Sequence, residues 1–287
     1  MKKLEFKSWE EERVCHECGK DYMANIASFG DLSGGRCREC RDKQIRAIQD
    51  AEETTKQMAI AHKRLSWRSE SGIPPLFLNK EFGSFELDRP GNIRKVHGKC
   101  LAYAEGFPLN YFERRRSTGK AYPSLLMYSD GVWGVGKSML SCSIAHNIYN
   151  RWNGEEISNP VVYENEPDLL RRIRGTYSFS NDDRRVRESE DDIISRLASK
   201  PLLILDDVGK EEPRDPKFVR RILYEIINSR YNNLLPMVVT TNLKPEQLKG
   251  YVGTEDNQAT YDRLFEMCDG AFYKLTGKSY RRKVEGK

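Results

Sequence analysis

The sequence has no long apolar run, and no stretch approaches the about eighteen residues that a membrane-spanning helix needs. Its first residues are charged and lack the apolar segment of a signal peptide. The net charge is only +5 over 287 residues, so the chain as a whole is not a polycation. We therefore expect a cytoplasmic protein with no membrane partner, long enough for one full α/β domain and a small appendage.

Disulfide frameworks are uncommon in the cytosol, so the seven cysteines indicate free thiols or metal ligands. Four of them form two C-x-x-C pairs separated by eighteen residues, the spacing of a Cys₄ zinc ribbon: Cys15, Cys18, Cys37 and Cys40. We expect these thiolates, rather than His16 inside the first pair, to bind Zn²⁺. The other cysteines are isolated and are expected to be ordinary buried thiols: Cys100, Cys142 and Cys268.

The stretch between the two cysteine pairs holds too few apolar side chains for a hydrophobic core, so metal binding would have to drive the folding of a zinc-ribbon module that spans residues 1–42. Five basic residues surround its second cysteine pair and could serve either a protein or a nucleic acid: Arg36, Arg38, Arg41, Lys43 and Arg46. Residues 41–70 lack proline and glycine, which predicts a helix, and we assign 43–70 as a linker. Pro74 and Pro75 then break the helix, and a third domain occupies 71–287.

The most informative motif is the P-loop signature G-x-x-x-x-G-K-S at residues 131–138. Its glycines let backbone N–H groups turn onto phosphates, Lys137 reaches the β and γ oxygens, and Ser138 can ligate Mg²⁺. A strand-like run at 124–129 and a helical pattern at 139–149 flank it, as this mechanism requires, whereas a plain glycine-rich turn is the alternative. The residues predicted to bind ATP here are Gly131, Val132, Trp133, Gly134, Val135, Gly136, Lys137, Ser138 and Met139.

A second nucleotide element follows where the apolar run 202–205 ends in two carboxylates. Asp206 would hold Mg²⁺ through water, and Asp207 would orient or deprotonate the water that attacks the γ-phosphate. A third strand-like run, 236–242, ends in Asn242, whose amide can bond both that phosphate and that water. For each of these residues the alternative is a turn at the end of a strand.

Further periodicities complete an α/β pattern. We expect a strand at 161–164, a basic loop at 109–120, and helices at 92–105, 167–177, 193–199 and 218–231. Because strands and helices alternate, the predicted fold is a parallel sheet with helices on both faces. The nucleotide site would lie at the carboxyl ends of the strands.

These motifs resemble the AAA+ ATPases of the DnaC, DnaI and IstB group, which includes bacterial and phage replicative-helicase loaders. Beyond the ATP motifs, three segments carry the resemblance: Ser71-Gly72-Ile73-Pro74-Pro75-Leu76 with Phe82 and Phe85, Tyr261-Asp262-Arg263-Leu264, and Gly277-Lys278-Ser279-Tyr280-Arg281. The resemblance covers residues 71–287. It implies a P-loop AAA+ domain with a reduced lid, in a bacterial cell or encoded by a phage.

By this resemblance, Arg263 is an arginine finger that reaches ATP held by a neighbouring subunit, so hydrolysis would require self-association. A surface arginine on an amphipathic helix is the alternative. Arg281 could act as a second phosphate sensor. The family binds single-stranded DNA, and four residues are candidates for that contact: Tyr177, Phe179, Lys217 and Phe218. Packing of these aromatic rings on the core is the alternative.

The resemblance implies an ATPase that converts ATP to ADP and phosphate and loads a hexameric replicative helicase onto single-stranded DNA during DNA replication. Its zinc module and linker helix would grip the helicase. Asp207 stands where many such ATPases carry glutamate, and its shorter side chain predicts slow turnover, which suits a switch. Two alternatives stay open: an IstB-like transposition accessory ATPase on duplex DNA, and a zinc-ribbon adaptor that binds nucleotide without hydrolysing it.

Overall fold

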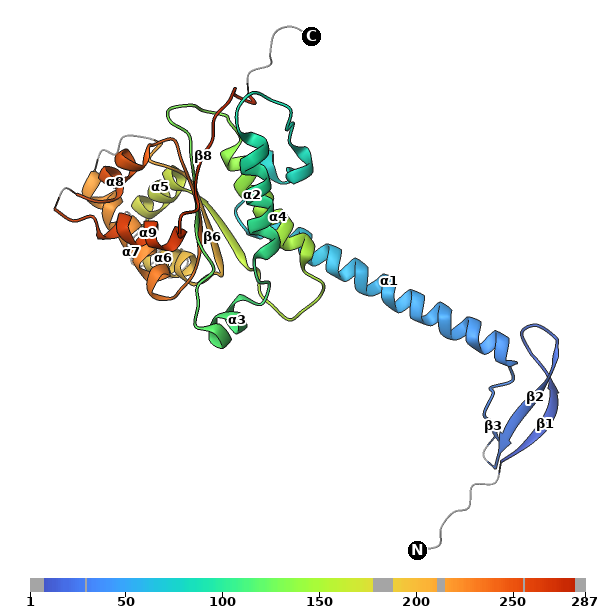
Figure 1. Cartoon of the computed structure of the whole chain (residues 1–287). Helices are drawn as coiled ribbons and strands as arrows, with labels where there is room; N and C mark the ends of the chain where they lie inside the picture. The colour runs from blue at the N-terminus through green and yellow to red at the C-terminus, as the bar shows by residue number, and fades with distance from the viewer. Residues whose placement is uncertain (1–7, 29, 178–187, 211–214, 255, 282–287) are drawn as a thin grey trace, which may run out of the picture. The chain divides into compact units, whose positions relative to one another are not determined.

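The computed structural model describes residues 8–28, 30–177, 188–210, 215–254 and 256–281. The chain divides into two compact units, Met1–His62 and Lys63–Lys287. Figure 1 shows the helices and strands of both units. Within the described ranges, no helix combines the length and the apolar character that crossing a membrane requires.

The first unit contains a small antiparallel sheet in the order β1-β2-β3. Strands β1 (Ser8–Val14) and β2 (Asp21–Ala27) pair along their whole length, and the short β3 (Gly30–Asp31) adds to β2. Helix α1 (Arg38–Glu70) follows directly. It begins three residues before residue 41, where the sequence predicts a helix, and its first turn carries Cys40 of the second C-x-x-C pair.

The second unit is built on five parallel strands in the order β5-β6-β7-β4-β8. The strands are β4 (Leu125–Tyr128), β5 (Val161–Asn165), β6 (Leu202–Val208), β7 (Met237–Thr241) and β8 (Phe272–Lys274). The predicted parallel α/β fold is confirmed, and β8 is an addition that the sequence pattern does not reveal. The inner strand β6, between β5 and β7, is buried on both faces, which explains its uninterrupted apolar run.

Helices cover both faces of this sheet (Figure 1). One face carries α2 (Ile93–Gly106) and α4 (Lys137–Arg151). The other face carries α5 (Glu166–Thr176), α6 (Glu190–Ser199), α7 (Pro216–Asn232), α8 (Pro245–Val252) and α9 (Ala259–Cys268), whose apolar residues form one core with the sheet. Among the described residues after α9, β8 is the only regular element.

Local signals explain where the helices begin. Helix α6 begins three residues earlier than predicted because Ser189 and Asp192 form a reciprocal capping box. Helix α7 begins with Pro216 in its first turn, while the side chain of Asp215 accepts a hydrogen bond from the backbone N–H of Phe218.

The basic loop predicted at 109–120 is wrong, because residues Tyr111–Thr118 form helix α3. Its anchor is Tyr111, a buried side chain whose hydroxyl donates to the backbone oxygen of Leu234. Arg115 adds a 2.6 Å hydrogen bond to the oxygen of Asn233, and Gly119 ends the helix in the left-handed conformation. Tertiary contacts therefore hold a helix whose own apolar pattern is too weak to predict it.

Two short 3₁₀ helices, η1 (Pro75–Phe77) and η2 (Phe82–Ser84), lie between α1 and α2. This segment packs against the helix that follows the P-loop. His146 Nε2 lies 3.0 Å from the oxygen of Phe77, and Ser143 Oγ donates to the oxygen of Lys80. The segment between α1 and α2 therefore contacts α4, the helix that follows the P-loop.

Candidate nucleotide site and cysteine cluster

The predicted P-loop connects β4 to α4. Its three glycines, Gly131, Gly134 and Gly136, all have positive φ, of 66°, 76° and 102°. At Gly136 a side chain would also meet the ring of Phe85, at 3.4 Å. Because α4 begins at Lys137, the unpaired N–H groups of its first turn lie where a phosphate would bind.

Lys137 and Asn242, predicted as partners in one site, are in direct contact. The Lys137 ammonium donates to Asn242 Oδ1 at 2.7 Å and to Ser129 Oγ at 2.5 Å. Lys137 is only 6% exposed. This burial lowers its pKa to about 8, against the opposing charges of Asp207 and Asp206. The contact brings together residues from the end of β4, the start of α4 and the end of β7.

Asp206 is the more enclosed of the two predicted carboxylates, at 2% exposed. Its Oδ1 accepts from Thr240 Oγ1 at 2.6 Å, and its Oδ2 accepts from the Tyr163 hydroxyl at 2.7 Å. Burial raises the pKa of Asp206, with the charge of Asp207 adding to the rise, while hydrogen bonding by Thr240, Tyr163 and Ser138 opposes it. The predicted Mg²⁺ ligands Ser138 and Asp206 are thus neighbours, and their oxygens are of the kind that Mg²⁺ prefers.

Asp207 adopts the left-handed backbone conformation, with φ of 59°. The pairing of β6 with β7 is irregular between Leu205 and Val208, which accommodates this turn. The Asp207 carboxylate forms an ion pair with Lys210, with Oδ2 and Nζ 2.9 Å apart. A non-glycine residue held in this conformation is costly and is often found at functional sites.

Two cavities meet at these residues, with volumes of about 370 Å³ and 640 Å³. Both are lined by Phe77, Ser138, Asp207, Lys210 and Arg281. Their sizes fall in the range of small-molecule sites. The smaller also includes the P-loop from Trp133 to Met139, and the larger includes Asp206 and Tyr163.

The C-terminal segment returns to the P-loop. The backbone N–H of Tyr280 donates to the oxygen of Gly134 at 2.8 Å. Arg281 lies close enough to Lys137 for its charge to lower the pKa of that lysine. Arg281 is therefore placed at the cleft, where the sequence predicts a phosphate sensor.

Arg263 lies on α9, and neither cavity is lined by it. Its guanidinium packs over the rings of Tyr224 and Tyr231 of α7, at 5.7 and 5.8 Å. Its Nη1 has no hydrogen-bond partner among the described residues. Arg263 is thus separate from the nucleotide cleft of its own chain.

Three of the four predicted DNA contacts lie close together in the fold. Tyr177, 54% exposed, packs edge to face on Phe218, and Lys217 precedes Phe218 in α7. Two arginines complete this patch: Arg174 lies 4.7 Å from the centre of the Phe218 ring, and Arg221, which sequence reasoning missed, donates to the Tyr177 hydroxyl at 2.7 Å. The fourth candidate, Phe179, lies outside the described residues.

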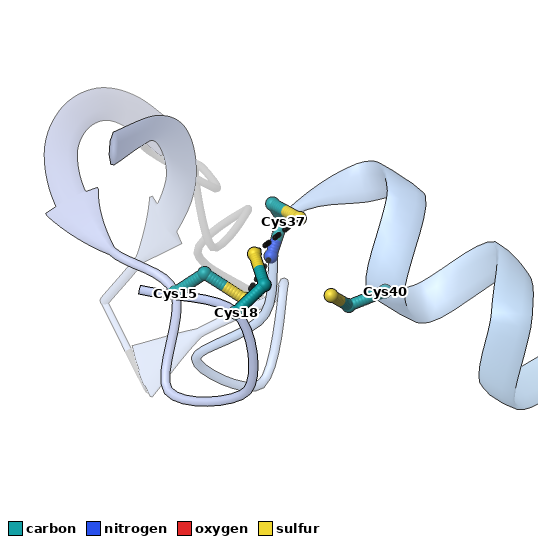
Figure 2. A group of neighbouring side chains, drawn as sticks. All are labelled: Cys15, Cys18, Cys37 and Cys40. Carbon is teal, nitrogen blue, oxygen red and sulfur yellow. Dashed lines mark hydrogen bonds between the residues drawn. The ribbon is translucent and has the colours of Figure 1, made fainter. Parts of the chain in front are cut away.

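In the first unit, the four predicted metal ligands form one cluster (Figure 2). Their sulfur atoms all lie within 4.8 Å of one another, and those of Cys18 and Cys37 are 3.7 Å apart. A tetrahedral site with Zn–S bonds of about 2.3 Å places its sulfurs about 3.8 Å apart. The donor set therefore fits zinc.

The sheet and α1 each supply half of this cluster. Cys15 and Cys18 follow β1, whereas Cys37 precedes α1 and Cys40 lies in its first turn (Figure 2). The backbone N–H of Cys37 donates to the sulfur of Cys15, which lowers the pKa of Cys15 to about 6. Asp31 organises the preceding turn by accepting hydrogen bonds from the backbone N–H groups of Ser33 and Gly35, at 2.7 and 2.9 Å.

Sequence reasoning missed four residues of the candidate nucleotide site: Ser129, Tyr163, Lys210 and Thr240. Ser129 directly follows β4, and Thr240 lies near the end of β7, so both stand at the carboxyl ends of strands where the sequence predicts the site. Their position could therefore have identified them. Tyr163 gave no such signal, because its contact with Asp206 depends on β5 and β6 being neighbours.

No family model matches the chain, and no curated protein matches it in sequence. Solved structures do match the fold. The DnaC helicase loader aligns over 71% of this chain and 100% of its own, with 18% identity and a TM-score of 0.52. DnaI aligns over 71% of this chain and 95% of its own, with 19% identity and a TM-score of 0.52.

A putative primosome component from Streptococcus pyogenes serotype M3 aligns over 76% of this chain and 98% of its own, with 17% identity and a TM-score of 0.53. At such identities the similarity concerns the fold. The second unit therefore shares the fold of the DnaC and DnaI structures.

Proposed function

We propose that this protein is an ATP-dependent loader that delivers a hexameric replicative helicase to single-stranded DNA. The observation that carries the proposal is the meeting of Lys137, Asn242, Ser138 and Asp206 at the carboxyl ends of β4, β6 and β7. Similarity in fold to the DnaC helicase loader and DnaI makes loading the favoured use of such a site.

The chain's own side chains account for phosphate binding. The α4 N-terminus and the Lys137 ammonium would bind the β and γ phosphates, and Asn242 would exchange its contact with Lys137 for one with the γ-phosphate. Ser138 and Asp206 would hold Mg²⁺, which neutralises developing charge on the phosphates. Asp207 would orient the attacking water.

Slow turnover follows from the state of Asp207. Its carboxylate is paired with Lys210 at 2.9 Å, so this contact must loosen or be shared before Asp207 can orient a water. A partner that moves Lys210 would accelerate hydrolysis. Such a site suits a switch, in which ATP holds one assembly and hydrolysis releases it.

Arg263 would act on another subunit. Its guanidinium is separate from its own cleft and has an unpartnered nitrogen. We assign it as the arginine finger that completes a neighbour's site, so ATP would drive self-association. The patch of Tyr177, Phe218 and Arg174 would contact the DNA strand by stacking and charge.

The first unit would bind the helicase, with Zn²⁺ held by the four cysteines and α1 as the connector. The test mixes the full chain with candidate hexameric helicases and closed circular single-stranded DNA, with ATP and without. We expect helicase to appear on the circles only when this protein and ATP are both present, and Lys137→Ala to abolish it.

Two results would contradict loading. Preference for duplex over single-stranded DNA in the presence of ATP would favour a transposition accessory ATPase. Nucleotide binding without any phosphate release above the Lys137→Ala control, even with DNA and helicase present, would favour an adaptor.

A further inference from the structure

Tyr163 connects the proposed magnesium site to the segment that follows α1. Its hydroxyl donates to Asp206 Oδ2 at 2.7 Å across the β5–β6 pair. Both side chains are almost completely buried, at 3% and 2% exposed. A hydrogen bond to a charged, buried carboxylate is stronger than one between neutral groups, so this contact fixes how Asp206 is oriented.

The backbone of the same residue holds the end of α1. The N–H of Tyr163 donates to the oxygen of Ser71 at 2.7 Å. Ser71 is buried and bonds back into α1, through its N–H to the oxygen of Trp67 at 3.0 Å and through its hydroxyl to Arg68 at 2.9 Å. Gly72 follows with φ of 86°, and a side chain there would lie 2.6 Å from the oxygen of Tyr163.

The last turns of α1 are themselves fixed to the second unit. Trp67 is buried between the rings of Tyr149 and Trp152, with ring centres 5.9 and 4.7 Å away. Arg68 adds hydrogen bonds to Glu81 at 2.8 Å and to Asn150 at 2.7 Å. Packed contacts therefore run without interruption from Trp67 through Ser71 and Tyr163 to Asp206.

We propose that Tyr163 is a positioning residue that orients Asp206 for Mg²⁺ and makes the metal site depend on how the last turns of α1 are seated. This inference rests on the proposed function, because it concerns the same metal site. Tyr163 and Thr240 each use one acceptor position of the carboxylate, which leaves the remaining lone pairs for the metal shell. Without the hydroxyl, Asp206 Oδ2 loses this partner, and the carboxylate is held less firmly by Thr240 at Oδ1 alone.

The first test measures binding of ATP to the full chain by calorimetry, with Mg²⁺ and without, in wild type and Tyr163→Phe. Loss of a group that orients a metal ligand costs about 10- to 100-fold in metal affinity. We therefore expect the gain in ATP affinity from Mg²⁺ to fall about tenfold or more, with the Mg²⁺-free affinity within about twofold of wild type. An unchanged gain would overturn the positioning role.

The matched control is Tyr122→Phe, which removes a hydroxyl that donates to the oxygen of Tyr103 at 2.7 Å, away from both nucleotide cavities. It should leave the gain from Mg²⁺ unchanged. An equal fall in the control would show a general effect of losing a hydrogen-bonded tyrosine hydroxyl and would also overturn the inference. Absence of ATP binding by wild type would instead refute the proposed function.

The second test addresses the link to α1. Gly72→Ala forces a side chain against the oxygen of Tyr163 in a backbone conformation that alanine rarely adopts, while Asp206 and its partners stay intact. We expect the gain from Mg²⁺ to fall at least about threefold, as a milder form of the metal-ligand effect. Gly98→Ala in α2, where nothing lies within 4 Å, is the control. If both glycine variants keep the wild-type gain, the dependence on α1 is refuted.

Discussion

The Lys137 ammonium donates a 2.7 Å hydrogen bond to Asn242 Oδ1, although 105 residues separate the two in sequence. Ser129 shares this contact, because its hydroxyl lies 2.5 Å from the ammonium and 3.1 Å from the amide oxygen. A lysine that is buried and already held in place loses less side-chain freedom when a phosphate binds. In the proposed function, the contact would therefore prepare the cleft for a triphosphate.

Asn242→Ala should separate binding from hydrolysis. Lys137 and the α4 N-terminus remain, so we expect ATP affinity within about fivefold of wild type. Loss of the amide that would bond the γ-phosphate and the water should lower phosphate release about 100-fold or more. Calorimetry and a phosphate-release assay check the two parts, with the exposed Asn232→Ala as control. Equal losses of affinity and turnover would refute the assigned role.

Mixing two inactive variants tests whether Arg263 acts on a neighbouring subunit. Arg263→Ala keeps an intact cleft but lacks the finger, and Lys137→Ala keeps the finger but lacks an intact cleft. Each variant alone should therefore lose nearly all ATPase activity, and the loss for Arg263→Ala should be about 1,000-fold. An equimolar mixture should regain a measurable fraction, since some interfaces then combine a good cleft with a good finger. The exposed Arg116→Ala, away from both cavities, should keep wild-type activity. No recovery in the mixture would contradict action in trans.

Metal removal should unfold the first unit and leave the second folded. We expect one zinc per chain by elemental analysis, and loss of antiparallel strand signal on chelation, because the small sheet has little apolar core. Nucleotide binding by the second unit should persist. Cys40→Ser should lose the metal, whereas His16→Ala should retain it. Zinc loss in the histidine variant would show that the ligand set is wrong.

His146 should make stability depend on pH in the acid range. The ring is buried, and this burial lowers its pKa from 6.5 to about 4, with the charge of Arg68 adding to the shift. The unfolded chain therefore binds more protons than the folded chain between these two values. The contribution of His146 to the free energy of unfolding is therefore greatest above pH 6.5. It falls by about 1.4 kcal/mol per pH unit as the pH drops toward 4.

His146→Gln should flatten that dependence. Denaturant unfolding between pH 6.5 and 4.5 would show a smaller slope of stability against pH than wild type, since the contributions of carboxylates cancel in the comparison. His62→Gln, at an exposed position of α1, should keep the wild-type slope. Equal slopes for wild type and His146→Gln would contradict the assigned shift.

Contiguous motifs made much of the nucleotide cleft predictable. The P-loop, the two aspartates and Asn242 each stand at the end of a strand-like run, and parallel strands place such ends at one edge of a sheet. The same reasoning predicted the parallel fold. The cysteine spacing predicted a cluster whose sulfurs do come together.

What remained hidden depends on tertiary structure. The contact between Tyr163 and Asp206 can be predicted only if β5 is known to pair with β6, and a local sequence pattern does not determine the order of strands in a sheet. Strand β8 has only three residues, too few for a periodicity. Helix α3 is held by Tyr111 and Arg115, whose partners lie more than 100 residues away. The left-handed backbone of Asp207 follows from an irregular strand pairing, not from its residue type.

The most direct test of the account is the mass of assemblies formed on single-stranded DNA. We predict that the full chain forms oligomers on the DNA when ATP and Mg²⁺ are present, and that it stays monomeric with ADP. Lys137→Ala and Arg263→Ala should both prevent assembly. Oligomers of equal size with ATP, with ADP and without nucleotide, unaffected by either substitution, would contradict an ATP-controlled assembly.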